Sequence, residues 1–108
     1  MVKYLTKHRD EREQYRINFR MDLGKNERLT SIEEVRVLSW GKDVSDEFLD
    51  PTPPAFGETT VILWLRRAGE GEQAKGQYRL YVRARTNGGR DIVAQGYDRE
   101  LPPLFVAG

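Results

Sequence analysis

Basic and aromatic side chains alternate with apolar ones in the segment from Tyr78 to Arg85. On an extended chain, Arg79, Tyr81, Arg83 and Arg85 project to one side and the apolar residues project to the other. Arginines interleaved with a tyrosine on a strand could track phosphates and stack bases, as in sheet-based RNA readers. Arginine and tyrosine are also enriched in protein–protein interfaces. A plain solvated strand face is the third interpretation, and the segment alone leaves all three open.

Other groups that could do chemistry are few and scattered. His8 is the one histidine and there is no cysteine, so a zinc site would lack co-ligands. The run from Asp43 to Glu47 lacks the glycine and the ligand spacing of a calcium loop. The carboxylates fall mostly in turns and loops, not in an apolar setting suited to acid–base work. We therefore expect no catalytic residue, no metal site and no cofactor, hence a protein that is not an enzyme.

The composition of the 108-residue chain fits one soluble domain. Its 18 basic and 17 acidic side chains leave a net charge of +1, whereas nucleic-acid binders usually carry a clear basic excess. No apolar run approaches the roughly 20 residues of a membrane helix, and no secretory leader is recognisable. We expect neither a membrane nor a small-molecule substrate, and the charge balance argues against nucleic acid as a partner.

The near-cancellation of charge hides two segments of opposite sign. Residues 41–58 hold five acids and one lysine, and residues 66–90 hold seven bases and two acids. An acidic loop and a basic hairpin on one small body could steer assembly with neighbours or with copies of the chain. The alternative is that both segments are solvated surface.

Alternating and β-branched runs predict strands along the central part of the chain. We expect them over residues 15–21, 32–40, 59–65, 78–85 and 91–97. Asn87, Gly88 and Gly89 supply the tight turn of a hairpin between the last two. Three prolines within residues 43–57 predict a long connection, with a short edge strand near Glu47. The fold class is therefore all-β, a sandwich or a barrel.

The two ends of the chain differ from this body. We interpret residues 1–13 as an N-terminal arm, residues 14–98 as the sandwich and residues 99–108 as a C-terminal tail. The tail is apolar from Leu101 to Val106, although its two prolines oppose sheet pairing. It either packs back on the domain or docks elsewhere. Docking would make Leu104 and Phe105 partner contacts and residues 101–108 dispensable for folding. Trp40, at a strand end, is a further candidate contact.

The segment from Gly76 to Asn87 resembles the sixth strand of fibronectin type III and other immunoglobulin-like sandwiches. In those domains a tyrosine near the start of the strand forms the tyrosine corner, in which its hydroxyl bonds back to the preceding loop. Tyr78 matches that position. The resemblance implies an immunoglobulin-like (fibronectin type III-like) β-sandwich.

Most of the chain, from about Lys7 to Tyr97, resembles a family of small immunoglobulin-like proteins of tailed bacteriophages, often labelled fibre–tail adaptor proteins. The matching features are a charged lead-in and five short motifs: Tyr15-x-Ile17-x-Phe19, Ser39-Trp40-Gly41, Thr59-Thr60-Val61 with Trp64-Leu65, Tyr78-x-Leu80-x-Val82, and Thr86-Asn87-Gly88-Gly89-Arg90-Asp91. The members are virion components without known catalysis. The resemblance implies a virion structural protein, made in the bacterial host cytoplasm, that acts as a tail fibre adaptor or as a capsid decoration. Its partners would be a tail, fibre or major capsid protein, with homo-oligomers possible in the particle.

Two other functions stay open at this point. A fibronectin-like adhesion or carbohydrate-binding module requires Trp40 and Tyr81 to be exposed in one patch. A nucleic-acid-binding β-sandwich requires an affinity that falls steeply with salt. For contact with a partner protein, the sequence offers a set of apolar, aromatic and basic candidates: Trp40, Arg79, Tyr81, Arg83, Leu104 and Phe105.

Overall fold

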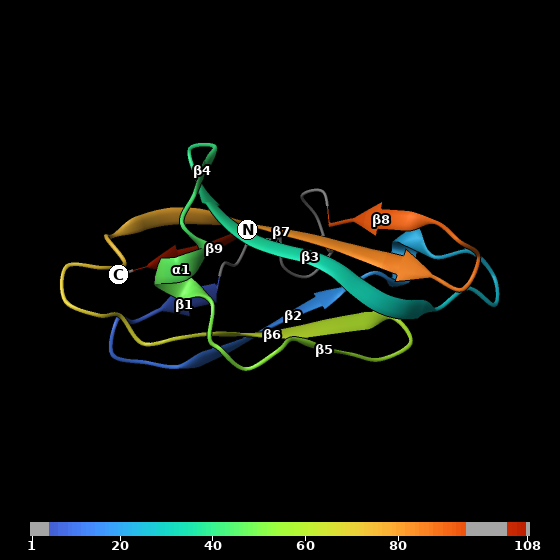
Figure 1. The fold of residues 1–108 in the computed structure, drawn as a ribbon, viewed down its shortest axis with the longest axis horizontal. Coiled ribbons are helices and arrows are strands. Elements are labelled where there is room, and N and C mark those ends of the chain that lie inside the picture. Colours follow the sequence, from blue (N-terminus) through green and yellow to red (C-terminus); the bar gives the residue numbers. More distant parts are fainter. Residues whose placement is uncertain (1–4, 95–103, 108) are drawn as a thin grey trace.

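The residues that the structure describes, 5–94 and 104–107 of a computed structural model, form nine strands in two facing sheets (Figure 1). The larger sheet has the order β1-β9-β7-β3-β4, with β8 also paired to β7. Its strands are β1 (Leu5–Lys7), β3 (Leu29–Ser39), β4 (Lys42–Asp43), β7 (Gly76–Thr86), β8 (Asp91–Val93) and β9 (Leu104–Ala107). The smaller sheet has the order β2-β6-β5, from β2 (Glu13–Asn18), β5 (Ala55–Phe56) and β6 (Thr60–Leu65).

The core lies between the two sheets and follows from the period of two in their strands. Alternate side chains of β7 and β6 are buried and face one another, as expected for strands with one inward face. The buried apolar members are Val61, Leu63, Leu65, Tyr78, Leu80, Val82 and Ala84. Each Å² of apolar surface removed from water stabilises the fold by roughly 25 cal/mol. The predicted all-β, sandwich-like architecture is confirmed at this level.

The predicted hairpin joins β7 to β8. The turn is closed by Thr86 N–H, which donates to Arg90 O at 2.9 Å, and by Gly89 N–H, which donates to Thr86 O at 3.0 Å. Gly89 has a φ of +81°, in the left-handed region that glycine adopts without a Cβ clash. The glycine run in the sequence therefore marks the turn correctly.

Tyr78 makes the bond that the tyrosine-corner resemblance implies. Its hydroxyl donates to Ala74 O at 2.6 Å, four residues upstream in the loop that precedes β7. Burial raises the pKa of Tyr78, so the phenol stays protonated and remains a donor. The loop before β7 is thus fixed to the start of the strand.

Both predicted appendages enter the larger sheet where the structure describes them, which corrects the sequence interpretation. Residues Leu5–Lys7 pair in parallel with β9, and β9 pairs with β7. The Phe105 side chain is completely buried, so the prediction that it contacts a partner is wrong. Its ring lies 5.0 Å from that of Phe48 and 5.5 Å from that of Tyr78. The prolines of the tail precede β9 and do not interrupt it; residues 1–4, 95–103 and 108 lie outside the described part.

Two short helical turns replace parts of the predicted strands. The end of the strand expected over residues 15–21 is η1 (Arg20–Asp22), a 3₁₀ turn. The edge strand expected near Glu47 is instead the helical turn α1 (Ser45–Phe48), whose Phe48 is fully buried. Ser45 fixes this turn to the sheet, because Val37 N–H donates to its Oγ at 2.9 Å.

A buried lysine joins β1 to the loop before β7. Lys7 Nζ donates to Gln73 Oε1 at 2.8 Å and to His8 O at 3.0 Å. Gln73 is also buried, and its Nε2 donates to Glu47 O and Arg66 O at 2.7 and 2.8 Å. The network connects β1, α1 and the end of β6.

Candidate interaction surface

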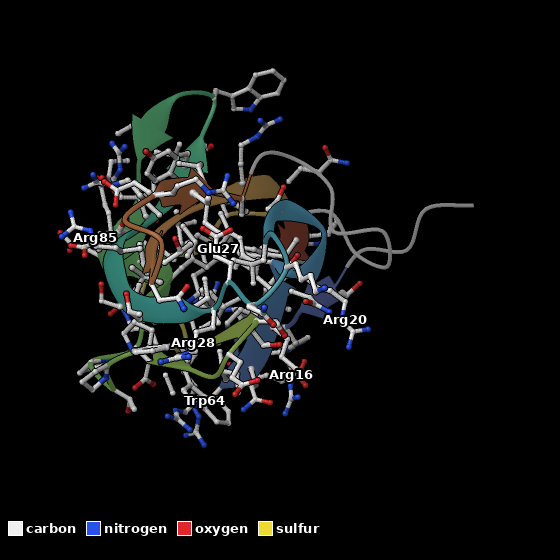
Figure 2. The ribbon with its side chains drawn as sticks, turned by 90° about the vertical axis from the view of Figure 1, so that its right-hand side faces the viewer. Arg16, Arg20, Glu27, Arg28, Trp64 and Arg85 are labelled. Carbon is white, nitrogen blue, oxygen red and sulfur yellow. The ribbon has the colours of Figure 1, made fainter. Side chains whose placement is uncertain are left out.

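The arginines on the outer face of β7 lie opposite carboxylates on the neighbouring strands. Arg83 lies 3.6 Å from Glu34 on β3 and 3.5 Å from Asp91 on β8. Arg85, labelled in Figure 2, lies 3.1 Å from Asp91 and 3.6 Å from Glu33. Asp91 raises the pKa of Arg85 through their hydrogen bond. Because these charges are balanced locally, this part of the face does not form the continuous cationic track that a phosphate backbone would need.

Tyr81 lies on the same outer face but is not open to solvent. The Arg36 guanidinium sits over its ring, 4.5 Å from the centroid, and Tyr81 is half-buried. Arg36 is held there by Glu34, whose Oε2 lies 2.8 Å from Arg36 Nε. The glycan alternative needed Trp40 and Tyr81 exposed together, and that arrangement is absent.

Trp40 occupies the tip of a hairpin that projects from the body of the sandwich (Figure 1). Ser39 pairs with Lys42, which leaves Trp40 and Gly41 as a two-residue turn. Both have positive φ, +52° and +81°, the signature of the type I′ turn that suits a right-twisted hairpin. Trp40 is fully exposed, so no packing among the described residues compensates the cost of a left-handed conformation at a bulky residue.

A groove of about 430 Å³ lies beside the tip. It is lined by Leu38, Trp40, Gly41, Gln77 and Arg79, from the end of β3 and the start of β7. Leu38 and Arg79 are cross-strand partners on the outer face. Unlike Arg83 and Arg85, Arg79 has no ion pair with any described carboxylate. The groove therefore combines apolar surface with an uncompensated cation.

The structure brings together two of the six candidates named from the sequence. Trp40 and Arg79 line one groove, whereas Tyr81 and Arg83 lie farther along the face in contact with Arg36, Glu34 and Asp91. The backbone of Leu104, on β9, pairs with that of Arg79, on β7. Sequence reasoning missed Leu38 and Gln77, because they reach the groove through the pairing of β3 with β7, which no local pattern encodes.

Trp64 lies on the outer face of the smaller sheet (Figure 2), because it alternates with the inward-facing Leu63 and Leu65 of β6. It is half-buried, and the Arg12 guanidinium covers its ring at 4.0 Å from the centroid. Asp50 holds Arg12 in place with a 2.8 Å bond to Nε, and that bond lowers the pKa of Asp50. The outer aromatic of this sheet is thus already covered.

At the end of the sandwich that carries the β7–β8 hairpin, the Glu27 carboxylate holds several segments together (Figure 2). It accepts bonds from Gly24 N–H at 2.8 Å, from Thr86 Oγ1 at 2.6 Å and from Arg90 Nε at 2.9 Å. These bonds, the one from Arg90 first, lower the pKa of Glu27 to about 2. One side chain thereby joins the turn before β3 to the hairpin between β7 and β8.

Replacing Glu27 with glutamine should destabilise the fold at neutral pH and have progressively less effect in acid. Since the pKa of Glu27 is about 2 in the fold against an ordinary 4.5, its charge stabilises above pH 4.5, and that contribution disappears as the pH falls toward 2. Urea unfolding of both proteins over this range measures the difference. Glu70→Gln, at an exposed loop position, is the control. An equal difference between wild type and Glu27→Gln at every pH would contradict this role of the charge.

Within the described residues there is no group of three His, Cys, Asp or Glu side chains placed to hold a metal ion. The same residues contain no helix long and apolar enough to cross a bilayer. No protein-family model matches the chain, and neither a curated protein nor a solved structure matches it.

Proposed function

We propose that this protein is a non-enzymatic structural component of a bacteriophage virion. It is an immunoglobulin-like domain that binds other virion proteins, as a fibre–tail adaptor or as a decoration of the head. The observation that carries the binding role is the fully exposed Trp40 on a projecting turn.

Two features support an immunoglobulin-like domain. The described strands form two facing sheets with a shared apolar core. Tyr78 bonds back to Ala74 from the start of a long central strand, as in the tyrosine corner of such sandwiches.

The cost of the Trp40 conformation supports a binding anchor. A bulky residue at positive φ is strained by roughly 1 kcal/mol or more, and such strain clusters at functional sites. Tryptophan is also among the residues that dominate binding energy in protein interfaces. Neither packing within the described chain nor turn preference favours tryptophan here, whereas contact with a partner would.

The virion assignment rests on the resemblance of Lys7 to Tyr97 to small tail-adaptor proteins, through the strand and turn motifs given above. A domain of this size with one small anchor would bind weakly by itself. Many copies on a symmetric particle gain avidity, because each further contact forms at a high effective concentration.

The test is whether the chain travels with virus particles. A strain that encodes it is induced, particles are purified on a density gradient, and mass spectrometry follows the chain across the fractions. We expect the chain to band with the particles, and Trp40→Asn to reduce its share in that band. Phe56→Ala removes another partly exposed aromatic and serves as the control. A chain that stays with the soluble proteins while particles form would contradict the proposal.

A further inference from the structure

We infer that the tip of the β3–β4 hairpin binds a second copy of this chain. In this symmetrical pair the Trp40 indole of each copy occupies the groove of the other, beneath its Arg79 guanidinium. The inference rests on the proposed function in one respect: both use the Trp40 tip as a binding surface.

The first support is that the projecting Trp40 side chain and the groove lie side by side on one patch. Trp40 projects from the turn and forms one wall of the groove, whose other lining residues are Leu38, Gly41, Gln77 and Arg79. A two-fold interface uses the same patch on both partners, so each patch must present both complementary shapes. A volume of about 430 Å³ lies within the range of small-ligand pockets and accommodates an indole ring.

The second support is the way this chain covers its other outward aromatics. Arg12 sits over Trp64 at 4.0 Å and Arg36 sits over Tyr81 at 4.5 Å. Among the described residues, Trp40 has no cation over its ring, and the nearby Arg79 has no carboxylate. Placing Arg79 of one copy over Trp40 of the other satisfies both through a cation–π contact.

The remaining charges of the tip allow two copies to approach. Lys42 and Asp43 are adjacent on β4 and cancel. Asp43 is kept ionised, since bonds from Ser45 lower its pKa. The patch is confined to one hairpin and the start of β7, so the buried area falls in the class of small, transient interfaces. A weak, reversible dimer follows.

The edge of β3 beside the tip is less suited to a second copy than the tip itself. The edge of β3 that faces away from β7 is covered near both of its ends. Leu29 N–H donates to Glu58 O at 2.8 Å, and Val37 is bonded to Val44 and Ser45. A long partner strand therefore cannot pair along this edge of β3.

Sedimentation equilibrium of the full chain, from roughly 10 µM to 1 mM, covers the affinities expected of such an interface. We expect a reversible monomer–dimer equilibrium that Trp40→Asn weakens at least tenfold and Arg79→Gln weakens measurably. Phe56→Ala should leave it unchanged. Asparagine followed by glycine suits a type I′ turn, so Trp40→Asn should fold with an unfolding midpoint no lower than wild type.

A second readout follows the indole itself. In Trp64→Phe, Trp40 is the one remaining tryptophan, and its fluorescence should shift to the blue as concentration rises into the dimer range. A monomer at every concentration, or a dimer that survives Trp40→Asn, overturns the inference. Absence of the dimer alone does not contradict the proposed function, because incorporation into particles is measured separately. A monomer whose incorporation still depends on Trp40 would identify the occupant of the groove as a different virion protein.

Discussion

Replacing Phe105 with alanine should lower the free energy of unfolding by about 3–5 kcal/mol, the usual cost of truncating a buried phenylalanine. The side chain is completely buried and packs edge-on against Phe48 and nearly parallel to Tyr78. The cavity would open between β9, β7 and α1, where three rings meet. The surrounding elements cannot collapse into it without breaking the register of β9 with β7.

Val106→Ala is the matched control for Phe105→Ala. Val106 is the next residue of the same strand and is half-exposed, so its truncation should cost much less. Urea or guanidinium unfolding followed by circular dichroism measures both. A loss below about 1 kcal/mol for Phe105→Ala would mean that the ring is not in the core.

Deleting residues 101–108 should have a larger effect than the single substitution. It removes Phe105 together with the strand that lies between β1 and β7. A tail that docks on a partner would be dispensable for folding. The structure instead predicts that removal of residues 101–108 disrupts the fold. A tail that ends in an apolar run after two prolines was open to either interpretation from sequence, and the packing of one aromatic ring decides it.

The strands of the central body were predictable because each carries its own signal. Alternating and β-branched runs located β6 and β7, and the glycine run located β8, the hairpin partner of β7. The bond from Tyr78 to Ala74 was expected from the resemblance to the tyrosine corner of immunoglobulin-like sandwiches. Pairing of β1 with β9 joins opposite ends of the chain, and no local pattern encodes a contact of that sequence separation.

The electrostatics of the outer face depended on register, which the sequence left open. Two irregularities in β3, near Thr30 and Glu33, shift its pairing with β7. As a result Glu34 lies opposite Arg83, and the basic face becomes a set of ion pairs. Arg79 escapes this neutralisation because its partner in β3 is Leu38. A count of arginines along one strand could not separate these two outcomes.

Trp40 shows the limit of composition-based reasoning in another way. Its place at a strand end was visible, and so was the glycine that follows it. The left-handed conformation of the tryptophan itself was not, because turn preferences favour asparagine or aspartate at that position. The disagreement between residue type and local geometry is the reason why we propose the tip as a binding surface, and it appears only in the structure.

Replacing Gln73 with methionine should destabilise the fold by about 3 kcal/mol, because it leaves buried polar groups without partners. Lys7 Nζ would lose the acceptor at 2.8 Å, and Glu47 O and Arg66 O would lose their shared donor. Methionine keeps the length of the side chain, so the loss reports hydrogen bonding and not a cavity. Gln77→Met, at an exposed position of β7, should change stability by less than about 0.5 kcal/mol.

The pH dependence of stability separates the charge of Lys7 from its packing. Burial lowers the pKa of Lys7 from its ordinary 10.5, so the unfolded chain binds the extra proton between the folded value and 10.5. Stability from this group therefore rises as the pH rises through that window. Lys7→Met should abolish the rise, and the double variant Lys7→Met with Gln73→Met should cost less than the sum of the single changes. Strict additivity, together with an unchanged pH profile, would show that the two side chains are not coupled in the folded protein. If coupling is found, the buried bond between Lys7 and Gln73 supports β1 in addition to its backbone pairing with β9, the strand that carries Phe105.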